Sequence, residues 1–159
     1  MATNKALRVQ LAEFVDWHHA HLGFDAAVKG IPPRLRGVVP KGFAHSIWQV
    51  VEHIRIAQAD ILDFCINPTY VHDMTWPDDY WPRTPAPRSA GAWTKAIAAI
   101  RRDRKAMQRL AMNPRIDLFA KIPHGSGQTY MRELLLVGDH AAYHISHIVD
   151  IRRALGNWK

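Results

Sequence analysis

Residues 46–66 read SIWQVVEHIRIAQADILDFCI and form the clearest helical pattern in the chain. Apolar side chains recur every three or four residues along this stretch, at positions 47, 50, 51, 54, 57, 61 and 65. Ser46 followed three residues later by Gln49 matches a capping box, and Asn67-Pro68 disfavours continuation of the helix. The stretch therefore predicts one amphipathic helix from about Ser46 to Ile66.

Three further proline-free segments repeat this periodicity, and proline-containing stretches separate them. These segments run from about Lys5 to Lys29, from about Ala90 to Met112 after an N-cap at Ser89, and from about Tyr130 to Leu155 after an N-cap at Thr129. Four amphipathic segments predict an all-α fold, a four-helix bundle with a long crossover between its second and third helices. This crossover, residues 67–88, is rich in tryptophan and proline.

Length and composition place the chain among ordinary globular domains. Its 159 residues, with 48% hydrophobic and 22% charged side chains, predict a single domain over residues 1–159. We expect no membrane association, because no apolar run could span a bilayer and no signal segment follows Met1. The single cysteine, Cys65, excludes an internal disulfide and a cysteine-based zinc site, and a reducing cytoplasm is the simplest compartment.

The fourth segment carries several histidines on one narrow stripe. At 100° per residue, Glu133, His140, His144 and His147 fall within about 60° of the helix circumference. The i, i+4 spacing of His140 and His144 would let one metal ion bind both imidazoles, whereas a solvated histidine face would explain the same pattern. A third ligand would come from another helix. His53 is the best candidate for it, although a histidine packed at the core boundary fits that position equally well.

Several stretches, taken in order, resemble the DinB-like (DinB/YfiT-like) family. They are residues 46–64, the crossover stretch WPDDYWPRTPAP at 76–87 with Trp93 after it, PHGSGQT at 123–129 leading into Arg132-Glu133, and DHAAYH at 139–144. The resemblance covers roughly residues 20–156. It implies an antiparallel four-helix bundle and a divalent metal held by three histidines, which correspond here to His53, His140 and His144.

This resemblance also implies a function. Three neutral imidazoles suit zinc or nickel, and three protein ligands leave coordination positions open, as in catalytic sites. The expected activity is metal-dependent transfer or isomerisation on a small-molecule substrate, with a low-molecular-weight thiol supplied as cosubstrate because the chain has only Cys65. A metal-dependent hydrolase and a non-catalytic metal-binding or stress-response protein remain alternatives. The resemblance also suggests a homodimer.

Other residues are assigned to the surroundings of the site. His147 stands where the family has glutamine, so it is a fourth ligand, a pocket base or a tolerated polar replacement. His21 and Glu133 are candidates for the second shell or the pocket, although boundary packing of His21 and a surface or capping-turn position of Glu133 explain them as well. Trp76 and Trp81 would either wall a pocket or only fix the crossover to the bundle.

The net charge of +7 invites an anionic partner, but it identifies no site. The basic residues of the third segment are spread around the helix, so we expect a solvated face and no nucleic-acid partner. These residues are Lys95, Arg101, Arg102, Arg104, Lys105 and Arg109. We expect the remaining histidines of the loops and helix starts, His45, His72 and His124, to be solvated or capping.

Overall fold

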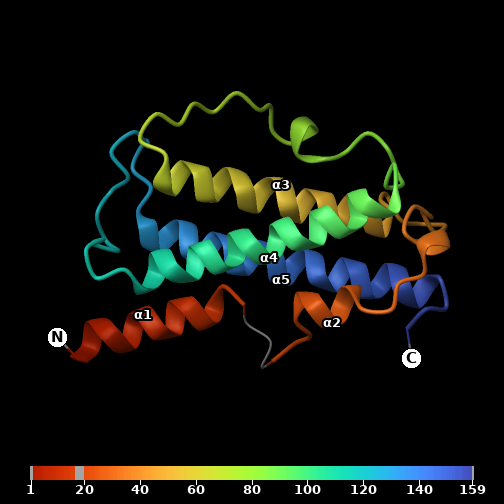
Figure 1. Cartoon of the computed structure of the whole chain (residues 1–159), viewed down its shortest axis with the longest axis horizontal. Helices are drawn as coiled ribbons and strands as arrows, with labels where there is room; N and C mark the ends of the chain where they lie inside the picture. Colours follow the sequence, from red (N-terminus) through yellow and green to blue (C-terminus); the bar gives the residue numbers. More distant parts are fainter. Residues whose placement is uncertain (1, 17–19, 159) are drawn as a thin grey trace.

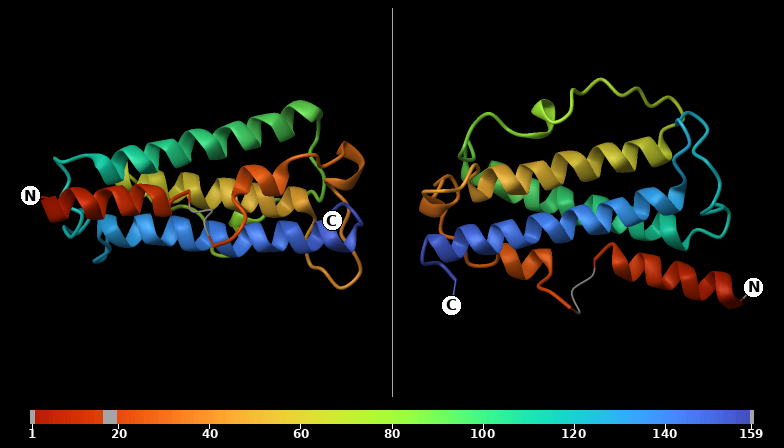
Figure 2. Two further views of the ribbon diagram at one scale, coloured as in Figure 1. Left: turned by 90° about the horizontal axis from the view of Figure 1, so that it is seen from below. Right: turned by 180° about the vertical axis from the view of Figure 1, so that it is seen from behind.

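The computed structural model describes residues 2–16 and 20–158, and within these ranges every regular element is helical. The helices are α1 (Ala2–Phe14), α2 (Phe24–Val28), α3 (Ile47–Ile66), α4 (Ala90–Met112) and α5 (Tyr130–Ala154), with 3-10 turns η1 (Pro33–Leu35) and η2 (Asp78–Tyr80). The predicted all-α fold is confirmed. Helices α3, α4 and α5 run side by side, and α1 and α2 lie end to end along the remaining side of the bundle (Figures 1 and 2). Among the described residues, no helix combines the length and the hydropathy that a membrane span requires.

The ends of the three long central helices follow the predicted caps. Ser46 Oγ accepts a hydrogen bond from the Gln49 amide while the Gln49 side chain accepts one from the Ser46 amide, which completes the capping box. Ser89 and Thr129 cap α4 and α5 through their side-chain oxygens, which accept hydrogen bonds from the amides of Ala92 and Arg132. Because these caps use only neighbouring residues, the sequence predicts the helix starts closely.

The predicted continuous helix from Lys5 to Lys29 is wrong. Helix α1 ends at Phe14, and α2 begins only after Gly23, whose extended backbone (φ −80°, ψ 162°) serves as its N-cap. Glycine favours such a break because it loses more backbone entropy in a helix than other residues do. Together α1 and α2 occupy the place of the first helix of the bundle (Figure 2). His18 and His19, which belong to the same predicted segment, lie outside the described residues.

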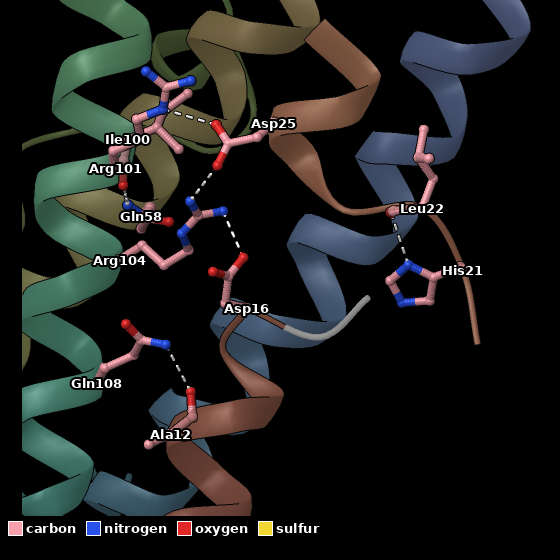
Figure 3. A network of polar contacts seen from close by, with 10 residues as sticks. All are labelled: Ala12, Asp16, His21, Leu22, Asp25, Gln58, Ile100, Arg101, Arg104 and Gln108. Carbon is pink, nitrogen blue, oxygen red and sulfur yellow. Dashed lines mark hydrogen bonds and ion pairs between the residues drawn. The ribbon is translucent and has the colours of Figure 1, made fainter. Parts of the chain in front are cut away.

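A buried arginine joins the facing ends of α1 and α2 to α4. Arg104 is only 8% exposed, and its two terminal nitrogens lie 2.7 Å from Asp16 and 3.0 Å from Asp25. Arg101 adds a second ion pair to Asp25 at 2.7 Å (Figure 3). The solvated face expected for the basic residues of α4 is therefore wrong for Arg104, since a guanidinium so buried requires paired carboxylates.

Two apolar clusters fill the interior of the described part of the chain. The larger one joins α2, α3, α4 and α5 through residues such as Val51, Ile54, Ile97, Ile100, Ile148 and Ile151, and the other joins α1 to the opposite ends of α3, α4 and α5 through Leu11, Leu62, Met107, Leu134 and Val137. Gly138 allows α1 to approach α5 closely, since a Cβ there would lie 2.4 Å from the Phe14 ring. The packed helices hold α3 and α5 beside each other, which sets the position of the histidines.

The connection between α3 and α4 folds back along α3 (Figure 1). The Tyr70 and Tyr80 hydroxyls both donate to the Asp60 carboxylate, at 2.8 and 2.5 Å. Further along, Gln49 donates to the Pro82 carbonyl at 3.1 Å, and the Ser46 hydroxyl donates to the Pro85 carbonyl. The connection is thus fastened to α3 along most of the helix, including the turn that carries His53.

Candidate metal centre

Three histidines from two helices meet between α3 and α5. His53 comes from α3, and His140 and His144 come from successive turns of α5. One nitrogen of each ring lies within 4.8 Å of the others. His53 and His144 are 1% and 6% exposed, whereas His140 is half-buried. The structure thus brings together the three residues that the sequence grouped, in an arrangement able to hold a metal ion.

The backbone of the crossover orients His53. His53 Nδ1 lies 3.0 Å from the Tyr80 carbonyl oxygen, which can only accept, so Nδ1 carries the proton and donates it. In the neutral ring Nε2 then keeps a free lone pair. This lone pair faces His140, whose Nε2 lies 2.9 Å away, at hydrogen-bond distance. A histidine that binds a metal through one ring nitrogen usually donates a hydrogen bond from its other ring nitrogen to an oxygen such as a backbone carbonyl.

His144 has a buried nitrogen without a partner. Its Nδ1 is inaccessible to solvent and makes no hydrogen bond within the described part of the chain. Leaving a buried polar atom unpaired costs free energy, so such atoms are uncommon and call for an explanation. A cation shared with His53 and His140 would supply the missing partner. The donor set therefore fits the divalent metal that the sequence predicts.

All three rings are held neutral by their surroundings. Burial lowers the pKa of His140 to about 4 and the pKa of His144 to about 3, and the neighbouring histidines contribute in the same direction. Burial likewise lowers the pKa of His53, although the hydrogen bond to Tyr80 opposes this effect. Only a neutral imidazole can ligate a metal, so the site is ready for an ion at neutral pH without releasing protons.

Trp81 covers one side of the cluster. Its ring lies 3.9 Å from the His53 ring at an interplanar angle of 1°, and its other face stacks on His45 at 3.8 Å and 9°. The edge of Trp81 also approaches His144, at a centroid distance of 5.7 Å. Trp76 lies at the border, 64% exposed and 6.3 Å from His53. Both tryptophans of the crossover thus contact His53, and Trp81 makes the closer contact.

The expectation that His45 is solvated or capping is wrong. His45 is half-buried, and its Nδ1 is inaccessible and has no hydrogen-bond partner among the described residues. Burial and the nearby His147 lower its pKa. Sequence reasoning missed this residue because it precedes the helix and approaches the site only through the returning crossover.

His147 lies next to the cluster without joining it. Its ring is 5.2 Å from the His144 ring and 4.4 Å from the Tyr143 ring, and it is half-buried. The group of rings that could share one ion contains His53, His140 and His144 but not His147. The helical stripe on which all the α5 histidines lie therefore continues one turn past the cluster.

Two other predicted pocket residues lie elsewhere. His21 is exposed near the junction of α1 and α2, with Nδ1 3.0 Å from the Leu22 carbonyl oxygen (Figure 3). Glu133 is 2% exposed, so a surface position is wrong for it, and its carboxylate pairs with Arg132 at 2.6 Å. It lines a separate pocket together with Asp60, among other residues. Neither residue is in the three-histidine group.

Comparison with known proteins identifies the family. The sequence matches the family model of the DinB superfamily over residues 17–148, a range that includes His53, His140 and His144. No curated protein and no solved structure is significantly similar to the chain. The matched range covers most of the sequence, and the all-helical fold agrees with it. The chain therefore belongs to the DinB superfamily.

Proposed function

We propose that this protein is a metal-dependent enzyme in which His53, His140 and His144 hold a zinc or nickel ion that acts on a small molecule. The observation that carries the proposal is the meeting of three neutral imidazoles, with a buried, unpartnered nitrogen on His144. Three neutral nitrogen donors suit these late divalent metals. A metal held there would supply Lewis-acid chemistry and would lower the pKa of a coordinated thiol or water.

An open coordination position favours catalysis over a purely structural role. Structural zinc sites are closed by four protein ligands, whereas catalytic sites use three. The group in the described part of the chain contains no fourth histidine, cysteine or carboxylate. His140 is half-buried, so this corner of the cluster is the side from which a substrate would enter.

The residues around the cluster have distinct proposed roles. Tyr80 and Trp81 hold His53 in one orientation and keep water from its covered face. His147, next to His144 and half-buried, would exchange a proton with the bound substrate.

The reacting thiol of a transferase or isomerase would come from a cosubstrate. Cys65, the single cysteine, is 5% exposed, and burial raises the pKa of its thiol to about 12. Such a thiol stays protonated and inaccessible, so it is a poor nucleophile. This supports a low-molecular-weight thiol as the second substrate. Hydrolysis of a small molecule is the alternative if no thiol binds.

Elemental analysis of tag-free protein tests the metal assignment. We expect about one zinc or nickel ion per chain in the wild type and almost none in His53→Ala or His140→Ala. His124→Ala serves as the matched control, because His124 is exposed and lies outside the three-histidine group. Stoichiometric metal retained in both site variants would overturn the assignment.

A cobalt-substituted sample tests the thiol. Adding a small thiol to the cobalt-loaded protein should produce a thiolate-to-cobalt absorption band in the near ultraviolet. The Cys65→Ser variant should show the same band, since the thiol is external. If the protein binds cobalt but the added thiol produces no such band, the metal assignment stands and the thiol-dependent reaction is rejected. Hydrolysis or non-catalytic metal binding would then be favoured.

A further inference from the structure

A basic groove lies between α3 and α4. It has a volume of about 920 Å³, and its walls come from α3, from the crossover between Pro82 and Arg88, and from the first half of α4. We call it the α3–α4 groove. Its size is that of a pocket for a small molecule. None of His53, His140 and His144 lines it.

Basic side chains from three separate elements line this groove. Arg55 comes from α3, Arg88 from the crossover, and Lys95 and Arg102 from α4, whereas Glu52 is the single acidic lining residue among those that the structure describes. Arg55 is paired with Glu52 at 2.8 Å, and Arg102 is paired with Asp103 at 2.8 Å. No ion pair or side-chain hydrogen bond of Arg88 or Lys95 occurs within residues 2–16 and 20–158. These two cations are therefore free to bind an external anion.

Small apolar side chains form part of the groove surface on α4. Ala92, Ala96 and Ala99 lie on successive turns of α4 and line the groove, with Lys95 and Arg102 on the same side of the helix. Larger side chains at the alanine positions would fill the space. A ligand with an anionic group and a compact organic part could thus contact the basic side chains through its anionic group and the alanines through its organic part.

We propose that the α3–α4 groove binds a small phosphorylated molecule, with Arg88 and Lys95 contacting its phosphate groups. Guanidinium and ammonium groups form strong charge-assisted hydrogen bonds with phosphate oxygens. The net charge of +7 favours the approach of such an anion. This site goes beyond the proposed metal-dependent activity and does not depend on it.

Calorimetric titration of the metal-free full chain with inorganic pyrophosphate tests this site. Metal-free protein is used because pyrophosphate chelates divalent ions. We expect saturable binding of pyrophosphate at low ionic strength. Arg88→Gln and Lys95→Gln should each weaken this binding about tenfold, because each removes one charge-assisted hydrogen bond. Both residues are exposed, so the two variants should have the same melting temperature as the wild type.

Two variants that remove the same charge elsewhere serve as controls. Lys105→Gln and Arg115→Gln change exposed residues that do not line the groove, and they should leave pyrophosphate affinity within about twofold of the wild type. No binding by the wild type, or equal weakening by all four variants, would overturn the proposal. The wild type could also bind a single-stranded oligonucleotide more tightly than pyrophosphate, with all four variants weakening that binding equally. This result would show a diffuse nucleic-acid surface and would also overturn the proposal.

Discussion

The indole ring of Trp81 lies parallel to the imidazole of His53, with their centroids 3.9 Å apart and an interplanar angle of 1°. The residue just before it, Tyr80, accepts the hydrogen bond from His53 Nδ1. Two consecutive crossover residues thus hold one candidate ligand by its ring face and by its ring nitrogen. On the far face of Trp81, His45 stacks in turn at 3.8 Å, which restrains the indole.

Removing the indole should loosen His53 and weaken metal binding. We expect Trp81→Ala to lower zinc affinity about 10- to 100-fold, the usual effect of losing a group that orients a ligand. Trp81→Phe, which keeps a flat ring against the imidazole, should recover most of the affinity. Competition with a chromophoric chelator measures both. Equal affinity of Trp81→Ala and wild type would show that the stack only anchors the crossover.

His144 and His147 should respond differently to substitution. His144→Ala removes a member of the three-histidine group and should abolish stoichiometric metal binding, whereas His147→Ala should retain the ion. Elemental analysis of the two purified variants makes the comparison, with thermal melting as a check on folding. Loss of metal from His147→Ala would make His147 a fourth ligand and would favour a closed, non-catalytic site.

Stability of the metal-free protein should fall as the solution is acidified. The folded pKa values of His140 and His144, about 4 and about 3, lie below the value of about 6.5 expected for the unfolded chain. Between these pKa values the unfolded state binds more protons than the folded state does. The contribution of the two neutral rings to the free energy of unfolding is therefore complete above pH ~6.5, and it is lost as the pH falls toward the folded pKa values.

Denaturant titrations of the metal-free wild type across this interval measure the effect. A His140→Gln/His144→Gln double variant provides the control, because it lacks the two titrating rings and should show a shallower dependence on pH. Identical slopes for both proteins would contradict the prediction.

Gly138 should not tolerate a side chain. A Cβ at this position would lie 2.4 Å from the Phe14 ring and 3.0 Å from the Phe14 carbonyl oxygen, so Gly138→Ala must push α1 away from α5. Such overpacking costs about 1–3 kcal/mol of the free energy of unfolding. Gly91→Ala in α4 is the matched control, because its nearest contact would be 3.7 Å, and it should stabilise the protein by about 0.5 kcal/mol. Chemical denaturation measures both variants.

The local features of this fold could be predicted from the sequence because they depend on neighbouring residues. The starts of α3, α4 and α5 follow from Ser46, Ser89 and Thr129, whose side chains bond to amides three residues ahead. The pairing of His140 with His144 follows from one helical turn. The residues around His53 fit a core-boundary histidine as well as a ligand, and the family resemblance selects the ligand.

Only the tertiary structure decided the features that depend on contacts between distant segments. The break between α1 and α2 is held by Arg104, about eighty residues further along, which pairs with Asp16 and Asp25 (Figure 3). The burial of Glu133 and the stack of Trp81 between His45 and His53 likewise depend on how the crossover and the helices pack. Periodicity and capping act over a few residues of one helix, whereas burial and ring stacking exist only after segments from different parts of the chain have met.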